Sequence, residues 1–164
     1  MPLTLDGNGD ISGLVAGALP ANVIGAGAVL QVVNATYSTE TTNNTDTYAD
    51  TGLSASITPT SATSKILVLA NNTVSKFGGN TQSGVHLNIV RGSTQIIQFA
   101  VLIGYTGATG TNVGSAGVAY LDSPATTSST TYKMQFKNGG ANAGGVHAQE
   151  SGATASITLL EIAA

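Results

Sequence analysis

The feature that most constrains this chain is a series of short β-prone segments separated by turn residues, running from about residue 28 to the C-terminus. The segments are rich in Val, Ile, Thr, Tyr and Phe, which favour a pleated, half-buried surface, and Gly, Asn, Ser and Pro punctuate them. We predict eight strands, at residues 28–37, 52–58, 65–75, 85–90, 94–103, 113–121, 130–137 and 153–162. No segment has a credible helical pattern.

Eight strands without helices predict an all-β fold, an antiparallel eight-stranded β-sandwich that is most simply a jelly roll. Arg91-Gly92-Ser93 is a predicted hairpin turn. The apolar run at 66–69 predicts that the third strand is covered on both faces for part of its length. Three long loops, at 39–51, 104–112 and 138–152, are rich in small residues, and long loops in a compact β domain are usually functional or mobile.

Residues 1–27 differ from the rest of the chain, and we treat them as an extended N-terminal arm that precedes a sandwich domain at 28–164. Asp6-Gly7-Asn8-Gly9 is a strong turn signal between short alternating segments, so a small hairpin is expected near the start. The arm cannot bury its own apolar residues. It is expected to anchor on a partner through a set of four, Leu3, Leu5, Ile11 and Leu14.

Charge is scarce: 8% of the 164 residues are charged, against about 25% in ordinary soluble domains, and the net charge is −3. The five cations are scattered, at Lys65, Lys76, Arg91, Lys133 and Lys137. Nucleic-acid binders need a clustered basic footprint and lipid-surface binders a basic amphipathic helix, so neither partner is expected. The 41% hydrophobic content argues against disorder, and the lack of cysteine excludes disulfides and thiolate metal sites.

Motifs that would carry enzymatic chemistry are weak. Asp6, Asn8 and Asp10 are spaced like the start of a calcium loop, but the later glycine and glutamate of that motif are missing, so a hairpin turn with solvated acids is the favoured interpretation. A catalytic triad would have to use His86 or His147, with Asp122, Glu150, Ser123 or Ser151 as the other members. No nucleophile-elbow, phosphate-loop or dinucleotide motif supports such a site, so we expect no enzyme activity and no cofactor.

Three stretches bracket nearly the whole chain: residues 1–14 (MPLTLDGNGDISGL), 48–68 (YADTGLSASITPTSATSKILV) and 155–164 (ASITLLEIAA). All three resemble parts of virion structural proteins of tailed bacteriophages. The first resembles the start of tail-fibre and virion proteins, and the other two resemble parts of their β-sandwich head domain. The resemblance implies a homotrimer, similar to tumour-necrosis-factor-like heads, on the surface of the phage particle.

Three functional hypotheses follow. The first is a capsid decoration, or cement, protein that binds the major capsid protein, favoured because the arm meets the sandwich without a long shaft. The second is a short tail fibre or fibre tip that binds host-surface glycan through loop residues such as Tyr105 and His147. The third is a carbohydrate-active enzyme on a jelly-roll fold, which the lack of a convincing acid pair disfavours.

Overall fold

The computed structural model describes residues 4–5, 11–12, 25–77, 82–140 and 144–164. The first two strands, β1 (Thr4–Leu5) and β2 (Ile11–Ser12), pair antiparallel in a two-stranded sheet of their own. This pairing confirms the small hairpin predicted near the start. Asp6, Asn8 and Asp10, which are spaced like the start of a calcium loop, and the predicted anchoring residues Leu3 and Leu14 lie outside the described residues.

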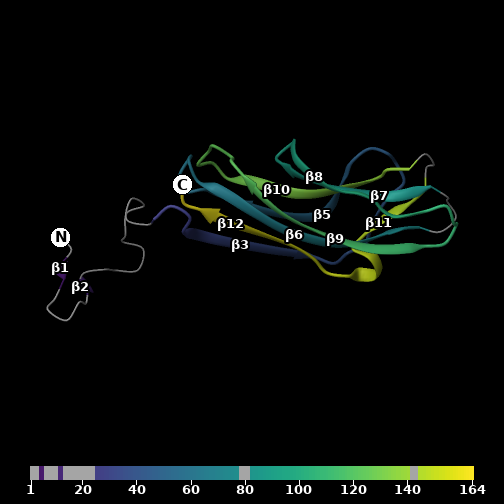
Figure 1. Cartoon of the computed structure of the whole chain (residues 1–164), viewed down its shortest axis with the longest axis horizontal. Coiled ribbons are helices and arrows are strands. Elements are labelled where there is room, and N and C mark those ends of the chain that lie inside the picture. Colours follow the sequence, from purple (N-terminus) through teal and green to yellow (C-terminus); the bar gives the residue numbers. More distant parts are fainter. Residues whose placement is uncertain (1–3, 6–10, 13–24, 78–81, 141–143) are drawn as a thin grey trace.

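The remaining strands form a sandwich of two antiparallel sheets, which confirms the predicted all-β fold (Figure 1). The four-stranded sheet has the order β5-β10-β7-β8. Its strands are β5 (Ala49–Ile57), β7 (Ser83–Arg91), β8 (Thr94–Thr106) and β10 (Thr130–Asn138). Figure 1 shows β8 and β10 of this sheet above β3, β12 and β6 of the other.

The six-stranded sheet is built around β6 (Lys65–Lys76). One side of β6 pairs first with β12 (Ala155–Ile162) and then with β11 (Val146–Ala148), while β9 (Asn112–Asp122) pairs along the other side. Beyond them, β3 (Val29–Tyr37) pairs with β12, and β4 (Thr41–Asn43) pairs with β11. A short 3-10 turn, η2 (Glu150–Gly152), connects β11 to β12.

Each of the eight predicted strands is present, with ends that differ by a few residues. The predicted hairpin is also present, because Arg91 pairs with Thr94 across a two-residue turn in which Gly92 has φ +60°. Two of the predicted long loops are partly wrong, since they contain β4 and β11. These three-residue strands gain their backbone partners from β6 and from each other, a long-range effect that a local pattern cannot reveal.

The core lies between the sheets and is filled by alternate side chains of both. From the six-stranded sheet come Ile66, Val68, Ile157 and Leu159, and from the other Leu53, Leu87, Ile89 and Phe136, all fully or almost fully buried. The third predicted strand is not covered on both faces by this chain, because Leu69, on the outward side of β6, is 38% exposed. Coverage of that face would require another molecule.

Glu161 is a buried carboxylate that ties β12 to two neighbouring segments. Its Oε2 accepts from Gln31 Nε2 at 2.6 Å, and its Oε1 accepts from the Thr60 backbone N–H and hydroxyl, both at 2.7 Å. Burial acts to raise the pKa of this carboxyl, but the hydrogen bonds outweigh burial, so the pKa lies below its usual range.

A lowered pKa in the folded chain means that ionised Glu161 stabilises the fold above the pKa of the unfolded chain. That contribution is lost as the pH falls through the lower, folded-state pKa. We therefore expect Glu161→Gln to lower the free energy of unfolding at pH 7 and to flatten its decline below about pH 4.5. Denaturant unfolding from pH 3 to pH 7 measures both effects. Parallel curves for the two proteins would show that Glu161 does not contribute to acid unfolding.

Candidate functional site

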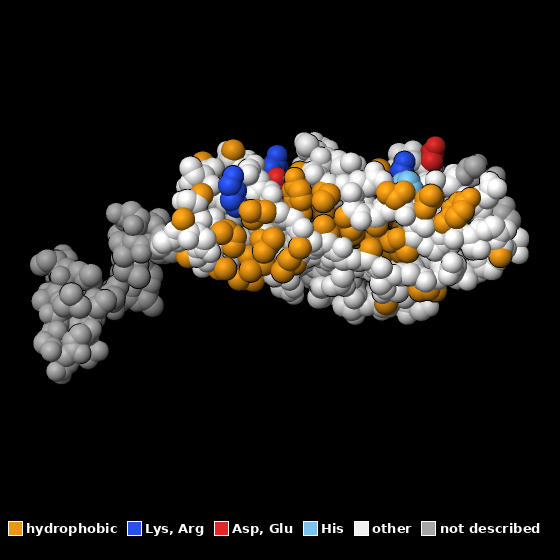
Figure 2. Space-filling view, viewed as in Figure 1, with side chains coloured by type: hydrophobic (Ala, Val, Ile, Leu, Met, Phe, Trp, Pro, Cys, Tyr) orange, Lys and Arg blue, Asp and Glu red, His pale blue; other side chains and the backbone are white. Residues whose placement is uncertain are grey.

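The outer face of the six-stranded sheet, meaning the side turned away from the core, carries a continuous apolar row. The strand register places Val32, Leu160, Leu67 and Leu121 side by side across β3, β12, β6 and β9. Val32 is 59% and Leu121 54% exposed. One row further along, Leu69 and Ala119 continue the apolar surface. Figure 2 views the side of the sandwich, next to the outer face, and shows hydrophobic side chains gathered where β6, β8 and β9 lie in Figure 1.

The polar part of the outer face is paired within itself. Asn34 Nδ2 donates to Thr158 Oγ1 at 2.8 Å, and Asn71 Nδ2 donates to Ser156 Oγ at 2.7 Å. Burial of a polar group costs little once it already has a hydrogen-bond partner. Two cross-strand rows, each running over β3, β12, β6 and β9, also contain no charged residue. One runs from Val32 to Leu121 and the other from Thr36 to Gly117. The outer face is therefore a sheet surface that another protein could cover at low desolvation cost.

At each edge of the sandwich a side chain packs over a glycine. At the β3–β5 edge, the Tyr37 ring lies over Gly52, so closely that a Cβ on this glycine would be 2.3 Å from the ring. At the β8–β9 edge, four apolar side chains remain about half exposed: Val101, Tyr105, Val113 and Leu121. On the inward side of β9, the Ile103 side chain covers Gly114, so closely that a Cβ on this glycine would be 2.5 Å from it. The β8–β9 edge is thus a second apolar surface, adjacent to the outer face.

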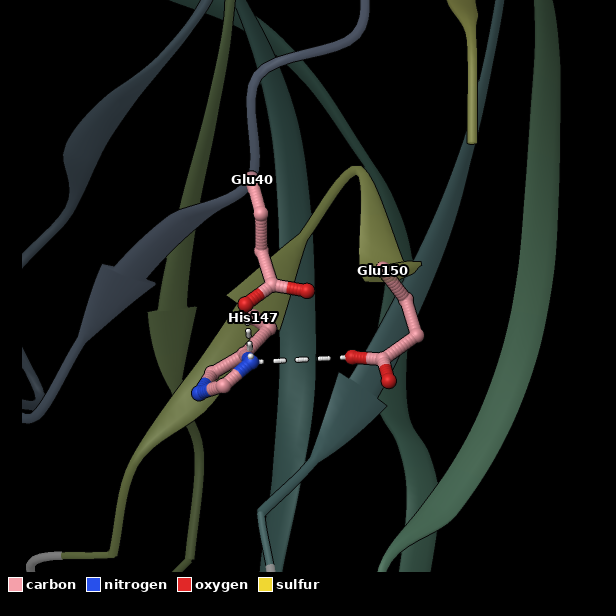
Figure 3. A group of neighbouring side chains, drawn as sticks. All are labelled: Glu40, His147 and Glu150. Atoms are coloured by element: carbon pink, nitrogen blue, oxygen red, sulfur yellow. Dashed lines mark ion pairs between the residues drawn. The ribbon is translucent and has the colours of Figure 1, made fainter. Parts of the chain in front are cut away.

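A titratable cluster lies at the opposite end of the outer face from the apolar row. His147 is on β11, paired with Thr42 on one side and Ser75 on the other. Its Nδ1 is 3.1 Å from Glu40 Oε1 and 3.6 Å from Glu150 Oε2 (Figure 3). The His147 and Glu150 side chains are 14% and 16% exposed, and Glu40 is 38% exposed.

The backbone around Glu150 is fixed by an unusual turn. Gln149 and Ser151 both have left-handed φ values, 55° and 54°, which are uncommon for residues other than glycine. The Gln149 side chain is fully buried, and its backbone N–H donates to Asn72 Oδ1 at 3.0 Å. This anchor on β6 directs the Glu150 side chain toward His147 of β11 and toward Ser75 of β6, whose Oγ donates to Glu150 Oε2 at 2.5 Å.

The structure places the two predicted loop-contact residues on strands. Tyr105 belongs to β8, which extends beyond its predicted end, and its side chain is 48% exposed. His147 belongs to β11 and contacts Glu40, a residue that no local motif linked to it. Of the predicted anchoring residues, Leu5 and Ile11 are partners in the β1–β2 pairing. Their role in anchoring stays a prediction.

The candidate triad residues lie in three separate places. Ser151 and Glu150 are beside His147, but the Ser151 hydroxyl donates to Glu150 Oε1 at 3.2 Å, whereas a nucleophile would bond to the imidazole. Asp122 and Ser123 lie at the far end of β9, where both contact Arg91. His86 has a buried Nε2 without a hydrogen-bond partner among the described residues, and burial together with the Lys137 charge lowers its pKa.

No protein-family model matches the chain. A search of curated proteins also found no match. Among solved structures, the chain is similar to one in the structure of infectious bursal disease virus, Gx strain, with a TM-score of 0.41 and 16% sequence identity. The similarity covers 82% of this chain and 37% of that one. Within the part of the chain that the structure describes, no helix is long and apolar enough to cross a membrane.

Proposed function

We propose that this chain is a non-enzymatic structural subunit of a phage virion, which self-associates through the outer face of its six-stranded sheet and decorates the capsid surface. The observation that carries the proposal is the outer face itself. Its apolar row is exposed, its polar groups are already paired, and its central rows lack charge. Contiguous apolar surface of this kind marks protein–protein contacts rather than solvent-facing sheet.

A homotrimer is the assembly that we favour. The outer face and the β8–β9 edge are two different apolar surfaces on one chain, with Leu121 belonging to both. If the edge of one copy packs on the outer face of the next, the contact is heterologous. A heterologous contact forms a ring when the rotation between copies closes and an open filament when it does not. The resemblance to trimeric phage head domains indicates a three-membered ring. The way the strands are divided between the sheets supports the jelly-roll connectivity of such domains. One sheet contains β3, β6, β9 and β12, and the other contains β5, β7, β8 and β10.

Substitution of Leu67 by Glu tests this assembly. The change places a charge at the centre of the apolar row, where burial against another copy would be costly. We expect the wild-type chain to have three times the 16.3 kDa monomer mass by light scattering and Leu67→Glu to be monomeric, with unchanged far-ultraviolet circular dichroism. Ser56→Glu, which adds the same charge to the exposed side of β5, should remain trimeric. A monomeric wild type, or a trimeric Leu67→Glu, would contradict the proposal.

Attachment to a capsid is tested separately, by the copy number of the chain relative to the major capsid protein in purified particles. Hundreds of copies in fixed ratio are expected of a decoration protein. A few to a few dozen copies would instead support the second candidate, a tail-fibre component that binds host-surface glycan.

The observation that favours this alternative is a pair of exposed aromatic side chains, Phe77 and Tyr105, at 53% and 48% exposure. Aromatic faces of this kind can stack on sugar rings.

A further inference from the structure

We propose that Glu40, His147 and Glu150 form a binding site for a divalent transition-metal cation of the zinc type. The three residues come from the β3–β4 connection, β11 and η2, and each offers a ligand atom within 4.8 Å of the others. Figure 3 shows that His147 Nδ1 points toward both carboxylates while the second ring nitrogen points away. The arrangement is that of three ligands around one small volume.

The distances fit a metal of this size. Zinc binds imidazole nitrogen and carboxylate oxygen at about 2.1 Å, which places tetrahedral ligands about 3.4 Å apart. The Nδ1 atom of His147 is 3.1 Å from Glu40 Oε1 and 3.6 Å from Glu150 Oε2, on either side of that value. Three protein ligands leave a fourth position for water. Solvent can reach it, because the Glu40 side chain is 38% exposed.

The donor set selects against the alkaline-earth cations. Calcium and magnesium prefer oxygen ligands alone, calcium six to eight of them, whereas imidazole suits zinc, copper, iron and nickel. The cluster provides one nitrogen and two carboxylates, with no cysteine in the chain to recruit softer metals. A zinc-type cation therefore fits better than Ca²⁺ or Mg²⁺.

The local charge also favours a cation. With a neutral imidazole, the cluster carries two negative charges. Among the described residues, His147 is the only ion-pair partner of either carboxylate. The nearby Lys76 is directed elsewhere, because its Nζ donates to the backbone carbonyls of Thr106 and Ala108.

The ligands are held in place by a second layer of contacts. Ser75 Oγ donates to Glu150 Oε2, and the Ser151 N–H donates to Glu40 Oε2 at 2.8 Å. The His147 ring stacks on Phe77, with centroids 5.1 Å apart. Hydrogen bonds to ligating carboxylates orient them and are typical of metal sites. A bound cation would tie three segments together that only the fold brings close.

Calorimetric titration of the full chain with ZnCl₂, after treatment with a chelator and its removal, tests this site. We expect saturable binding of one Zn²⁺ per chain at pH 7, a rise in the melting temperature with Zn²⁺, and no comparable binding of Ca²⁺ or Mg²⁺. Glu40→Gln should weaken Zn²⁺ binding at least about tenfold, since even loss of an outer-layer contact typically costs 10- to 100-fold. Because Glu40 is on the surface, this variant should remain folded.

Two controls separate this site from general surface binding. Asp50→Asn makes the same carboxyl-to-amide change on the four-stranded sheet, and His86→Asn removes the other histidine; both should bind Zn²⁺ like the wild type. Replacement of His147 by Asn should abolish the one-to-one binding. If wild-type and Glu40→Gln chains bind Zn²⁺ equally, or if neither binds it, the cluster is a hydrogen-bonded Glu–His–Glu group alone and the proposal is wrong.

Discussion

Substitution of Asp122 by Ala is expected to lower the free energy of unfolding by about 3 kcal/mol, because Asp122 joins the two sheets at one end of the sandwich. Its carboxylate accepts from Arg91 Nη1 at 2.9 and 2.7 Å and from the Tyr132 hydroxyl at 2.7 Å. Asp122 ends β9 in the six-stranded sheet, while Arg91 and Tyr132 are on β7 and β10 in the other. Removal of the carboxylate leaves the fully buried Tyr132 hydroxyl without this acceptor and a partly buried guanidinium without its counter-ion.

The pKa of Tyr132 reflects the same contacts, since burial and the neighbouring Asp122 carboxylate both raise it. Tyr132→Phe removes the hydroxyl but leaves the Arg91–Asp122 ion pair, so it should cost only about 1 kcal/mol. Asp46→Ala, at an exposed loop position, should change stability by less than about 0.5 kcal/mol. Urea unfolding at one fixed chain concentration measures all three, because self-association would make stability concentration-dependent. An Asp122→Ala protein as stable as Tyr132→Phe would show that the carboxylate is not the centre of this network.

The part of the fold that the sequence predicts is the set of strands in which apolar and polar residues alternate along the chain. In β12, Ile157 and Leu159 alternate with Ser156 and Thr158, and the structure buries the first pair and turns the second outward. The strands β4 (Thr41–Asn43) and β11 (Val146–Ala148) are not predictable from local pattern, because three residues are too few to show an alternation of apolar and polar side chains. Their pairing depends on β6, which is distant in sequence from both.

The His147 cluster and the apolar row both depend on strand pairing, which the sequence reveals only in part. His147 was identified as a residue of interest, but its partner Glu40 was not, because the contact forms when β4 and β11 pair. The apolar row is predictable only in part. The run at 66–69 predicts a strand covered on both faces, and the closing strand, with Leu160, is apolar toward both faces, which fits self-association. Only the register shows that Leu67 and Leu160 align with Val32 and Leu121 into one exposed row.

The largest packing effect is expected at Phe136, on β10 in the middle of the four-stranded sheet. Phe136 is fully buried and is in register with Ala49 of β5 and Leu87 of β7. Its ring projects into the core between the two sheets, where neighbouring side chains can collapse only partly into the space that a smaller residue leaves. We expect Phe136→Ala to lower the free energy of unfolding by about 3–5 kcal/mol, measured by urea unfolding.

Gln135 provides the control, because it precedes Phe136 on the same strand and faces the opposite way. Its Nε2 donates to Asp50 Oδ1 at 2.7 Å on the exposed side of the sheet, a contact worth at most about 1 kcal/mol. If β10 is in the register described, Gln135→Ala should therefore be several times less destabilising than Phe136→Ala. A shift of one residue would exchange the two faces and reverse the order. Equal effects would mean that β10 is not packed as a central strand with one buried face, and the core would then need a different register.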